Sequence, residues 1–138
     1  MNALPASAYP KHKQPALRQV MMPRDTNAVG TIFGGVILSM MDLAAATHAH
    51  AYHPGKIVTV SFDQVEFKHP VFVGDLVSLF CSTSHLGNTS IEVHVSVWAK
   101  RASDRDTHAH VTEGKVTFVA VGEDGRPTPI LRRDPELP

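Results

Sequence analysis

The chain has 138 residues, which is enough for one domain with a sizeable hydrophobic core. Its 13 basic and 13 acidic side chains balance at neutral pH, so no overall charge points to nucleic acid or an anionic membrane as a partner. The single cysteine, Cys81, excludes an internal disulfide and is compatible with a reducing compartment. Because the N-terminal sequence lacks the apolar stretch of a signal peptide, we expect a cytoplasmic protein.

The first part of the chain predicts an arm, a strand and a turn. Residues 1–16 contain three prolines, and we expect them to form a flexible N-terminal arm. The apolar run Leu17–Met22 ends at Pro23 and predicts the first strand. Turn-forming residues follow as far as the pair Gly34-Gly35, where the backbone can bend sharply before a helix begins.

A long apolar segment follows the glycine pair. From Val36 to about Tyr52 it predicts a helix of about 26 Å, which ends before Pro54 because proline disfavours helical geometry in the preceding residue. Apolar and small side chains leave this helix no continuous polar face, which is typical of a buried helix. Asp42 lies in its middle, so the sequence predicts a carboxylate inside the protein. The helix is too short and too rich in polar residues to span a membrane.

The hydrophobic period changes from helical to alternating after the helix, which indicates strands. Apolar positions from Val58 to Phe62 share one parity, whereas those from Val65 to Phe67 have the other. A two-residue repeat changes parity only if one residue is added, so we predict a bulge near Asp63-Gln64.

Three further strands are predicted at about Leu76–His85, Ile91–Lys100 and Thr107–Val121. Leu86-Gly87-Asn88 is a hairpin signal between the first two, and the regular alternation from Ile91 to Lys100 is typical of a half-buried strand. Short connections imply an antiparallel meander. Residues 123–138 are rich in proline and charge, and we expect them to form a surface tail.

This order of elements predicts an α+β domain in which one long helix is wrapped by a curved antiparallel sheet. Such a helix needs more cover than one small sheet supplies, so a partner for its remaining face is also expected.

Several segments resemble one protein family. The stretch from Met22 to Asp42, MPRDTNAVGTIFGGVILSMMD, resembles the N-terminal signature of hotdog-fold acyl-CoA thioesterases, in particular the YciA-like acyl-CoA hydrolase branch. VTVSFDQVEFKHPVFVGD is similar to that family's second strand and following turn, and SIEVHVSVWAK and VTEGKVTFVAV are similar to its last two strands. The resemblance covers about residues 17–130.

The resemblance implies a hotdog domain, here residues 17–122, that pairs edge to edge into double-hotdog dimers. Dimers of this family often form a trimer of dimers, and the active sites lie at the dimer interface. The implied reaction converts an acyl-CoA and water into a free carboxylic acid and coenzyme A. No cofactor is expected, because coenzyme A is part of the substrate and product.

Thioester hydrolysis needs a nucleophile or an activated water, together with donors for the oxyanion that forms on the carbonyl oxygen. Asp42 matches the acidic residue that acts as general base or nucleophile in the family. The alternative role for Asp42 is a structural carboxylate that satisfies a buried backbone group.

The loop and glycines before the helix supply the other candidate catalytic groups. A helix N-terminus presents unpaired N–H groups and the positive end of the helix dipole. The family places the oxyanion donor at the second glycine, here Gly35, and Gly34 would let substrate approach the backbone. The family also places an asparagine opposite the acid of the partner subunit, and Asn27 matches it. The alternatives are a tight turn that needs glycine only for its dihedral angles, and an asparagine used for its turn propensity.

Weaker candidates lie on strands and turns. Thr59 and Ser61, on the predicted second strand, are candidates for lining the substrate site. Coenzyme A carries phosphates, so we expect a basic contact near the mouth of its tunnel. The candidates are Lys100 and Arg101, and further Lys68, Arg105 and Arg132-Arg133. The alternative for each of these cations is a solvated surface position.

The nine histidines do not predict a metal site. His48 and His50 would lie on nearly opposite sides of the helix and cannot share one ion. His108 and His110 would face the same way on a strand, but no third ligand is suggested by spacing, so we expect a solvated pair. Cys81 is interpreted as a core residue.

Two other functions stay open from the sequence. A hotdog dehydratase acting on hydroxyacyl thioesters would pair a histidine with an acid, and no histidine stands in the glycine motif. A non-catalytic acyl-CoA sensor would bind the ester without turnover. The leading interpretation is an acyl-CoA thioesterase acting as a homo-oligomer, with the acyl chain length and the choice between general base and nucleophile undecided.

Overall fold

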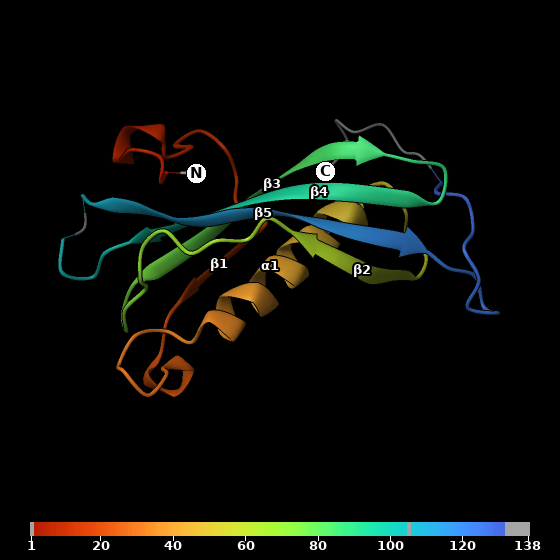
Figure 1. Cartoon of the computed structure of the whole chain (residues 1–138). Coiled ribbons are helices and arrows are strands. Elements are labelled where there is room, and N and C mark those ends of the chain that lie inside the picture. Colours follow the sequence, from red (N-terminus) through yellow and green to blue (C-terminus); the bar gives the residue numbers. More distant parts are fainter. Residues whose placement is uncertain (1, 105, 132–138) are drawn as a thin grey trace.

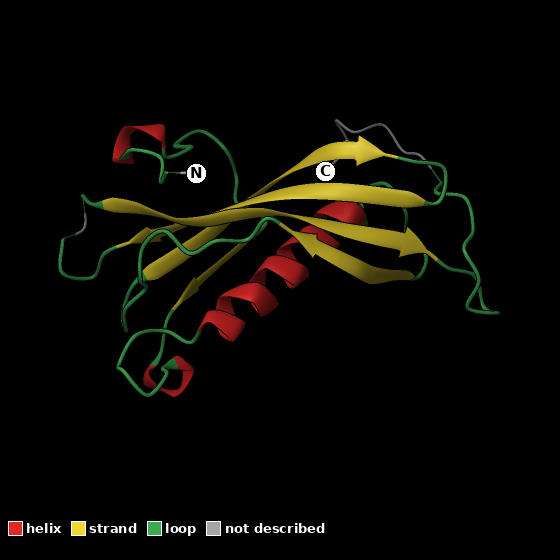
Figure 2. Cartoon of the chain, in the orientation of Figure 1, coloured by secondary structure: helices red, strands yellow, loops and turns green. Residues whose placement is uncertain are grey.

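The computed structural model describes residues 2–104 and 106–131 (Figure 1). A long helix, α1, lies across one face of a five-stranded antiparallel sheet, and the N-terminal segment lies on the other face (Figures 1 and 2). The strands are β1 (Leu17–Val20), β2 (Ile57–Asp63), β3 (Leu76–Leu86), β4 (Ser90–Lys100) and β5 (His108–Ala120). The helices are α1 (Gly34–Ala49) and the short 3-10 turns η1 (Ala6–Ala8) and η2 (Pro23–Asp25). This is the predicted α+β class.

The strand order is β1-β3-β4-β5-β2, and every pairing is antiparallel. The predicted meander is therefore correct only for β3, β4 and β5. β2 does not pair with β3, its neighbour in sequence, but with β5 at the far edge of the sheet (Figure 1). The prediction failed because residues 64–75 form a connection long enough to cross to the other side of the sheet.

Helix α1 begins and ends earlier than the sequence predicts. Gly34 and Gly35 form its first turn rather than a bend before it, and regular helix ends at Ala49, three residues before Tyr52. A glycine weakens a helix mainly in its interior, and the first-turn N–H groups have no helical partner in any case.

The core lies between α1 and the inner face of the sheet. Fully buried small residues, Ala44, Ala45 and Ala49, allow the helix to approach β3, β4 and β5 closely. The alternation predicted for β4 is confirmed, because its inner positions Ile91, Val93, Val95, Val97 and Ala99 are all fully buried.

An irregularity in β2 changes which side chains face the helix. The register against β5 shifts between Thr59 and Ser61, so that Val60 is the extra residue of a bulge. Thr59 pairs with Phe118, which is buried on the helix side. Ser61 pairs with the next residue, Thr117, and residues paired across a sheet share a face. Thr59 therefore faces the helix and Ser61 faces the outer side.

The bulge predicted near Asp63-Gln64 is wrong in position. The chain instead leaves the sheet there: β2 ends at Asp63, and Gln64 adopts a φ of 59°, which is uncommon for a residue other than glycine. Val65 then packs against Gly114 of β5. A Cβ added to Gly114 would lie only 2.6 Å from Cγ2 of Val65. The change of parity in the sequence thus has two causes, the bulge at Val60 and the exit at Gln64.

The N-terminal arm packs on the outer face of the sheet. The Tyr9 ring makes edge-on contacts with Phe80 and Trp98, each at a centroid distance of 5.6 Å, and its hydroxyl accepts a hydrogen bond from Arg18. Trp98 is only 1% exposed, although its place in the alternation of β4 is on the outer side. The chain thus covers this face of its sheet with its own arm.

The same arm covers the two histidines of β5, and the expectation of a solvated pair is wrong. They do face the same way: Tyr9 stacks on His108 at 3.9 Å, and the backbone N–H of Leu4 donates to Nδ1 of His110 at 3.0 Å. Desolvation lowers the pKa of both imidazoles. Within the described residues, no helix has the length and apolar character needed to cross a membrane, and no group of histidine, cysteine and acidic side chains is placed to hold a metal ion.

Candidate active site

Asp42 lies on α1 at the border between the buried and exposed faces of the helix. Its Oδ1 accepts a hydrogen bond of 2.7 Å from Oγ1 of Thr59 on β2. The residue is half-buried, so the prediction of a carboxylate inside the protein is wrong for a single chain. The helix exposes a stripe that includes Ser39, Leu43 and Thr47, and Leu43 is 60% exposed. Asp42 is therefore accessible in the single chain.

The N-terminus of α1 offers two backbone donors. Phe33 precedes the helix without a side-chain cap, and the N–H of Val36 bonds the Phe33 carbonyl oxygen. Within the described residues, the N–H groups of Gly34 and Gly35 have no acceptor. These amides and the helix dipole together provide partial positive charge suited to a developing oxyanion.

A cavity of about 320 Å³ lies beside this helix end. Its lining is mainly apolar and comes from the loop before α1, the first turns of α1 and the connection after β2. The lining residues are Thr31, Ile32, Gly34, Ile37, Phe67, Lys68, His69, Pro70 and Val71. The cavity can therefore hold an apolar group next to the free amides.

Asn27 holds the loop before α1 in shape. Its Oδ1 accepts the N–H groups of Val29 and Thr31, and its Nδ2 donates to Oγ1 of Thr31 at 2.8 Å. A side-chain amide has two donor hydrogens and one acceptor oxygen, so these bonds occupy the oxygen and leave one N–H for another partner. Asn27 thus has the turn role that was the alternative to a catalytic one, and it can still donate one hydrogen bond.

Asp42 and the helix N-terminus are far apart in one chain. The seven-residue step from Gly35 to Asp42 corresponds to about 10 Å along the helix axis. Reacting groups must lie about 3–3.5 Å from the atom they attack, so Asp42 cannot attack a carbonyl held at Gly35 of the same chain. The structure brings together Asp42 with Thr59. Separately, it places Gly34 against the cavity, with Gly35 next to it in the first turn of α1. Ser61 joins neither group.

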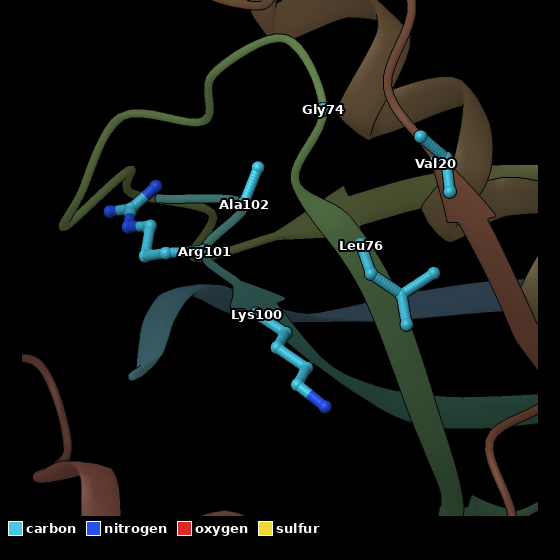
Figure 3. Close-up of a pocket in the computed structure, with 6 residues that line it drawn as sticks. All are labelled: Val20, Gly74, Leu76, Lys100, Arg101 and Ala102. Atoms are coloured by element: carbon cyan, nitrogen blue, oxygen red, sulfur yellow. The ribbon is translucent and has the colours of Figure 1, made fainter. Parts of the chain in front are cut away.

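The predicted phosphate contacts Lys100 and Arg101 line a different cavity, also of about 320 Å³, whose side chains are drawn in Figure 3. The two side chains extend in different directions (Figure 3). Arg101 donates to Oδ2 of the buried Asp75 at 2.6 Å and stacks on the Phe72 ring, so it stabilises the corner between β3 and β4. Its guanidinium is engaged within the fold.

Lys100 lies far from Asp42 of the same chain. Thr59 pairs with Phe118, and Phe118 pairs with Ile91 near the start of β4. Lys100 is at the other end of β4, about 30 Å from Ile91 at about 3.3 Å per residue. Of the other cations, Lys68 borders the cavity at α1 and pairs with Glu66, while Arg105 and Arg132-Arg133 lie outside the described residues.

Cys81 packs against the core, as interpreted from the sequence, and burial raises the pKa of its thiol to about 12. A thiol with so high a pKa is a poor nucleophile at neutral pH, so Cys81 does not compete with Asp42 for a catalytic role.

Sequence reasoning missed two aromatic rings at the helix N-terminus. The ring of Phe33 lies against Gly35, and the ring of Phe67 lies against Gly34. The signal available was the sequence FGG, in which an aromatic residue directly precedes the glycine pair. Nothing local connects Phe67 to the glycines, because the two meet only when the connection after β2 crosses the helix end.

Comparisons with known proteins agree with this architecture. Residues 29–103 match the thioesterase superfamily. The acyl-CoA thioester hydrolase YciA of Salmonella typhimurium is 39% identical over 83% of this chain and 87% of its own length. A hexameric hotdog-fold thioesterase of Campylobacter jejuni is 46% identical, with a TM-score of 0.80 over 86% of this chain and 90% of the other.

A hexameric thioesterase from Yersinia pestis is similar at 37% identity, with a TM-score of 0.79 over 86% of this chain and 96% of the other. Sequence and structure therefore agree over most of each chain. We conclude that this chain belongs to the thioesterase superfamily and, within it, to the hotdog-fold, YciA-like acyl-CoA thioester hydrolases.

Proposed function

We propose that the protein is an acyl-CoA thioesterase whose active site is assembled from two copies of the chain. One copy supplies Asp42, and the other supplies Asn27 and the Gly35 N–H. The observation that carries this proposal is the separation of about 10 Å between Gly35 and Asp42 in one chain. Both groups are accessible in the single chain, so a second copy can bring them together.

The surface around Asp42 supports such pairing. β2 is an edge strand that presents unpaired backbone groups, and edge strands of this kind are usually covered. Apolar side chains on β2 and the adjacent face of α1 are exposed, namely Leu43, Val58, Val60 and Phe62. We propose that β2 pairs with β2 of a second copy, which gives the double-hotdog dimer. The hexameric state of the Campylobacter jejuni and Yersinia pestis thioesterases favours a trimer of such dimers.

In the proposed reaction, the Gly35 N–H polarises the thioester carbonyl, and the charge that develops on its oxygen is stabilised by the helix dipole. The free N–H of Asn27 donates a second hydrogen bond at the reacting centre. The carboxylate of Asp42 from the other copy takes a proton from the attacking water, or attacks the carbonyl carbon itself to form an anhydride that water then opens. Both routes release coenzyme A as the thiol and the acyl group as the acid.

Thr59 has a supporting role in this proposal. Its hydroxyl donates to Oδ1 of Asp42 and leaves Oδ2 free to act on water or substrate. The reaction uses only water and groups of the protein, so we propose no cofactor. For the phosphates of coenzyme A, Lys68 and Lys100 stay candidates, whereas Arg101 is committed to Asp75.

A panel of acyl-CoA esters of increasing chain length tests this proposal, with thiol release followed by a thiol-detecting reagent. We expect turnover of at least one ester and its loss in Asp42→Asn. An inactive wild-type protein, or full activity in Asp42→Asn, would contradict the proposal. Tight binding of esters without turnover would favour the sensor interpretation instead.

A further inference from the structure

Two polar side chains in the cavity beside the start of α1 have unused hydrogen-bonding capacity. The polar side chains of its lining belong to Thr31, Lys68 and His69. Lys68 is paired with Glu66 at 2.6 Å. Thr31 and His69 instead make hydrogen bonds that leave part of each side chain free for a ligand.

The hydroxyl of Thr31 has a hydrogen left to donate. Its Oγ1 accepts from Nδ2 of Asn27 at 2.8 Å, and a hydroxyl has one donor hydrogen besides its lone pairs. Within the described part of the chain, this hydrogen has no acceptor. Thr31 is half-buried and lines the cavity, so its hydroxyl can donate to a ligand there.

The ring of His69 has an acceptor left. Its Nδ1 lies 2.9 Å from the carbonyl oxygen of His110, and because that oxygen can only accept, Nδ1 carries the hydrogen. In the neutral ring Nε2 then has a lone pair, and among the described residues nothing donates to it. His69 therefore offers an acceptor in the same cavity to which Thr31 offers a donor.

Backbone hydrogen bonds hold the two segments together at the cavity. Ile32 follows Thr31, and its N–H donates to the carbonyl oxygen of Val71 at 2.8 Å. Val71 belongs to the connection that carries His69, and the His69 ring is itself bound to β5. The loop before α1 and the connection after β2 are thus joined, so both polar groups have fixed places in the cavity wall.

One donor and one acceptor among apolar walls match a secondary amide on a saturated chain. An unsubstituted acyl chain has no polar atom beyond its carbonyl group and would leave both protein groups unpaired. The pantetheine arm of coenzyme A has its first amide about 6 Å beyond the thioester carbon when the chain is extended. Thr31 is three residues before Gly34, so their Cα atoms lie within about 11 Å of each other, which fits this spacing.

We propose that this cavity binds the pantetheine arm of the substrate rather than its acyl chain. The carbonyl oxygen of the first pantetheine amide accepts from the Thr31 hydroxyl, and the N–H of that amide donates to Nε2 of His69. This inference rests on the proposed function and assigns two substrate-binding residues to its site.

Two small thioesters of the acyl group in the best coenzyme A substrate isolate this amide. The N-acetylcysteamine ester keeps the first amide of the arm, whereas the pentanethiol ester has the same chain length and no amide. Thiol release gives kcat/KM for each ester, and the ratio of the two values measures recognition of the amide. In Thr31→Val and in His69→Phe, we expect the ratio to fall by about tenfold, because one group of the amide loses its partner.

The ratio separates this role from an indirect effect through Asn27. If Thr31→Val only disturbed the Asn27 amide, both esters would lose activity equally and the ratio would not change. Thr31→Ser keeps the hydroxyl and should keep the wild-type ratio. Thr26→Val is the matched control, because the Thr26 hydroxyl lies in the same loop but donates to Pro23 and is outside the cavity.

An unchanged ratio in either Thr31→Val or His69→Phe would overturn the inference and leave the proposed function intact. Thr31→Ala and His69→Leu replace these variants in the same test if either does not fold. Hydrolysis of the coenzyme A ester without measurable hydrolysis of the N-acetylcysteamine ester would also overturn the inference. Wild type inactive on every ester would contradict the proposed function and the inference with it.

Discussion

Asp75 and Asp42 lie in two regions of the molecule that treat a carboxylate in opposite ways. Asp75, at the start of β3, is 2% exposed and accepts hydrogen bonds from Arg101, from the N–H of Phe72 and from the N–H of Ala102. Asp42 is half-buried and accepts one side-chain hydrogen bond, from Thr59.

The surroundings of Asp75 are closed, whereas those of Asp42 are open. The corner around Asp75 is closed by its own chain, and the three donors that bond its carboxylate all belong to that chain. The face around Asp42 has an unpaired strand edge and exposed apolar side chains. Asp75, with three donors from its own chain, stabilises the fold. Asp42 has one such donor and lies on an exposed apolar face, so its carboxylate is available for chemistry. The comparison thus separates a structural acid from a candidate catalytic one.

The largest expected effect is on activity at Asp42. Asp42→Asn keeps the shape and the Thr59 contact but removes the base or nucleophile, so kcat should fall by about 10²- to 10⁴-fold. The urea midpoint should change little. Steady-state kinetics with a good ester substrate measure kcat. Asp106→Asn, at an exposed acid of the β4–β5 turn, is the control for loss of one negative charge.

The opposite pattern is expected at Asp75. Asp75→Asn leaves the mostly buried Arg101 guanidinium without its counter-charge, which should lower the free energy of unfolding by about 3–5 kcal/mol. Activity per folded molecule should stay near that of wild type. Adding Arg101→Met should restore part of the stability. If Asp75→Asn lowered kcat without lowering stability, the assignment of the two carboxylates would be reversed.

A smaller effect on activity should separate Thr59 from Ser61. Thr59→Val removes a hydrogen bond to a charged group, and we expect about a tenfold loss of kcat. Thr59→Ser should recover most of it. Ser61→Ala, on the outer face of β2, should retain activity within about twofold, since it breaks no contact with Asp42. Equal losses in Thr59→Val and Ser61→Ala would show that the register of β2 does not determine access to Asp42.

The smallest effect concerns the outer face of the sheet, which the N-terminal arm closes. Burial lowers the pKa of His110 from its ordinary value of 6.5, against the opposing influence of Glu113 and with smaller contributions from His69, Lys68 and His94. The unfolded state therefore binds the proton more readily, so the stability is complete above pH 6.5 and falls as the pH drops toward the pKa of the folded state.

One proton contributes at most about 1.4 kcal/mol per pH unit to this loss. Protonation of Nδ1 also removes the acceptor for the Leu4 N–H, so the arm should loosen at acid pH. Urea unfolding at pH 7.5 and 5.5 measures the loss of stability. Fluorescence of Trp98, the only tryptophan, reports the loosening of the arm. His110→Gln should weaken both dependences, whereas His12→Gln in the exposed part of the arm should not.

Much of the fold follows from local patterns in the sequence. The alternation in β4, the Gly87 hairpin and the antiparallel pairing are local signals, and the structure confirms them. Strand order was missed because no local pattern shows that residues 64–75 cross the sheet. The predicted position of the bulge is wrong because a change in the parity of the apolar residues shows that one residue is added but not where. A strand that ends at Gln64 changes the parity in the same way.

The candidate site was predictable to a lesser extent. The glycine pair and Asp42 could be named from one motif, but their separation along α1 appears only once the helix bounds are known. Arg101 was assigned to substrate because a cation at a turn has no visible partner in the sequence. Its partner, Asp75, lies 26 residues away, and the two meet through tertiary folding.

The central claim is that Asp42 of one copy works with Asn27 of another. Co-expression of Asp42→Asn and Asn27→Ala chains carrying different tags, followed by purification on both tags, isolates mixed assemblies. Each variant alone should be nearly inactive. A twofold-symmetric mixed dimer holds one intact site and one doubly altered site, so it should have about half of wild-type activity, and assemblies of randomly paired chains should have about a quarter. Activity no higher than that of the separate variants would contradict the account, because it would place both residues of each site in the same chain.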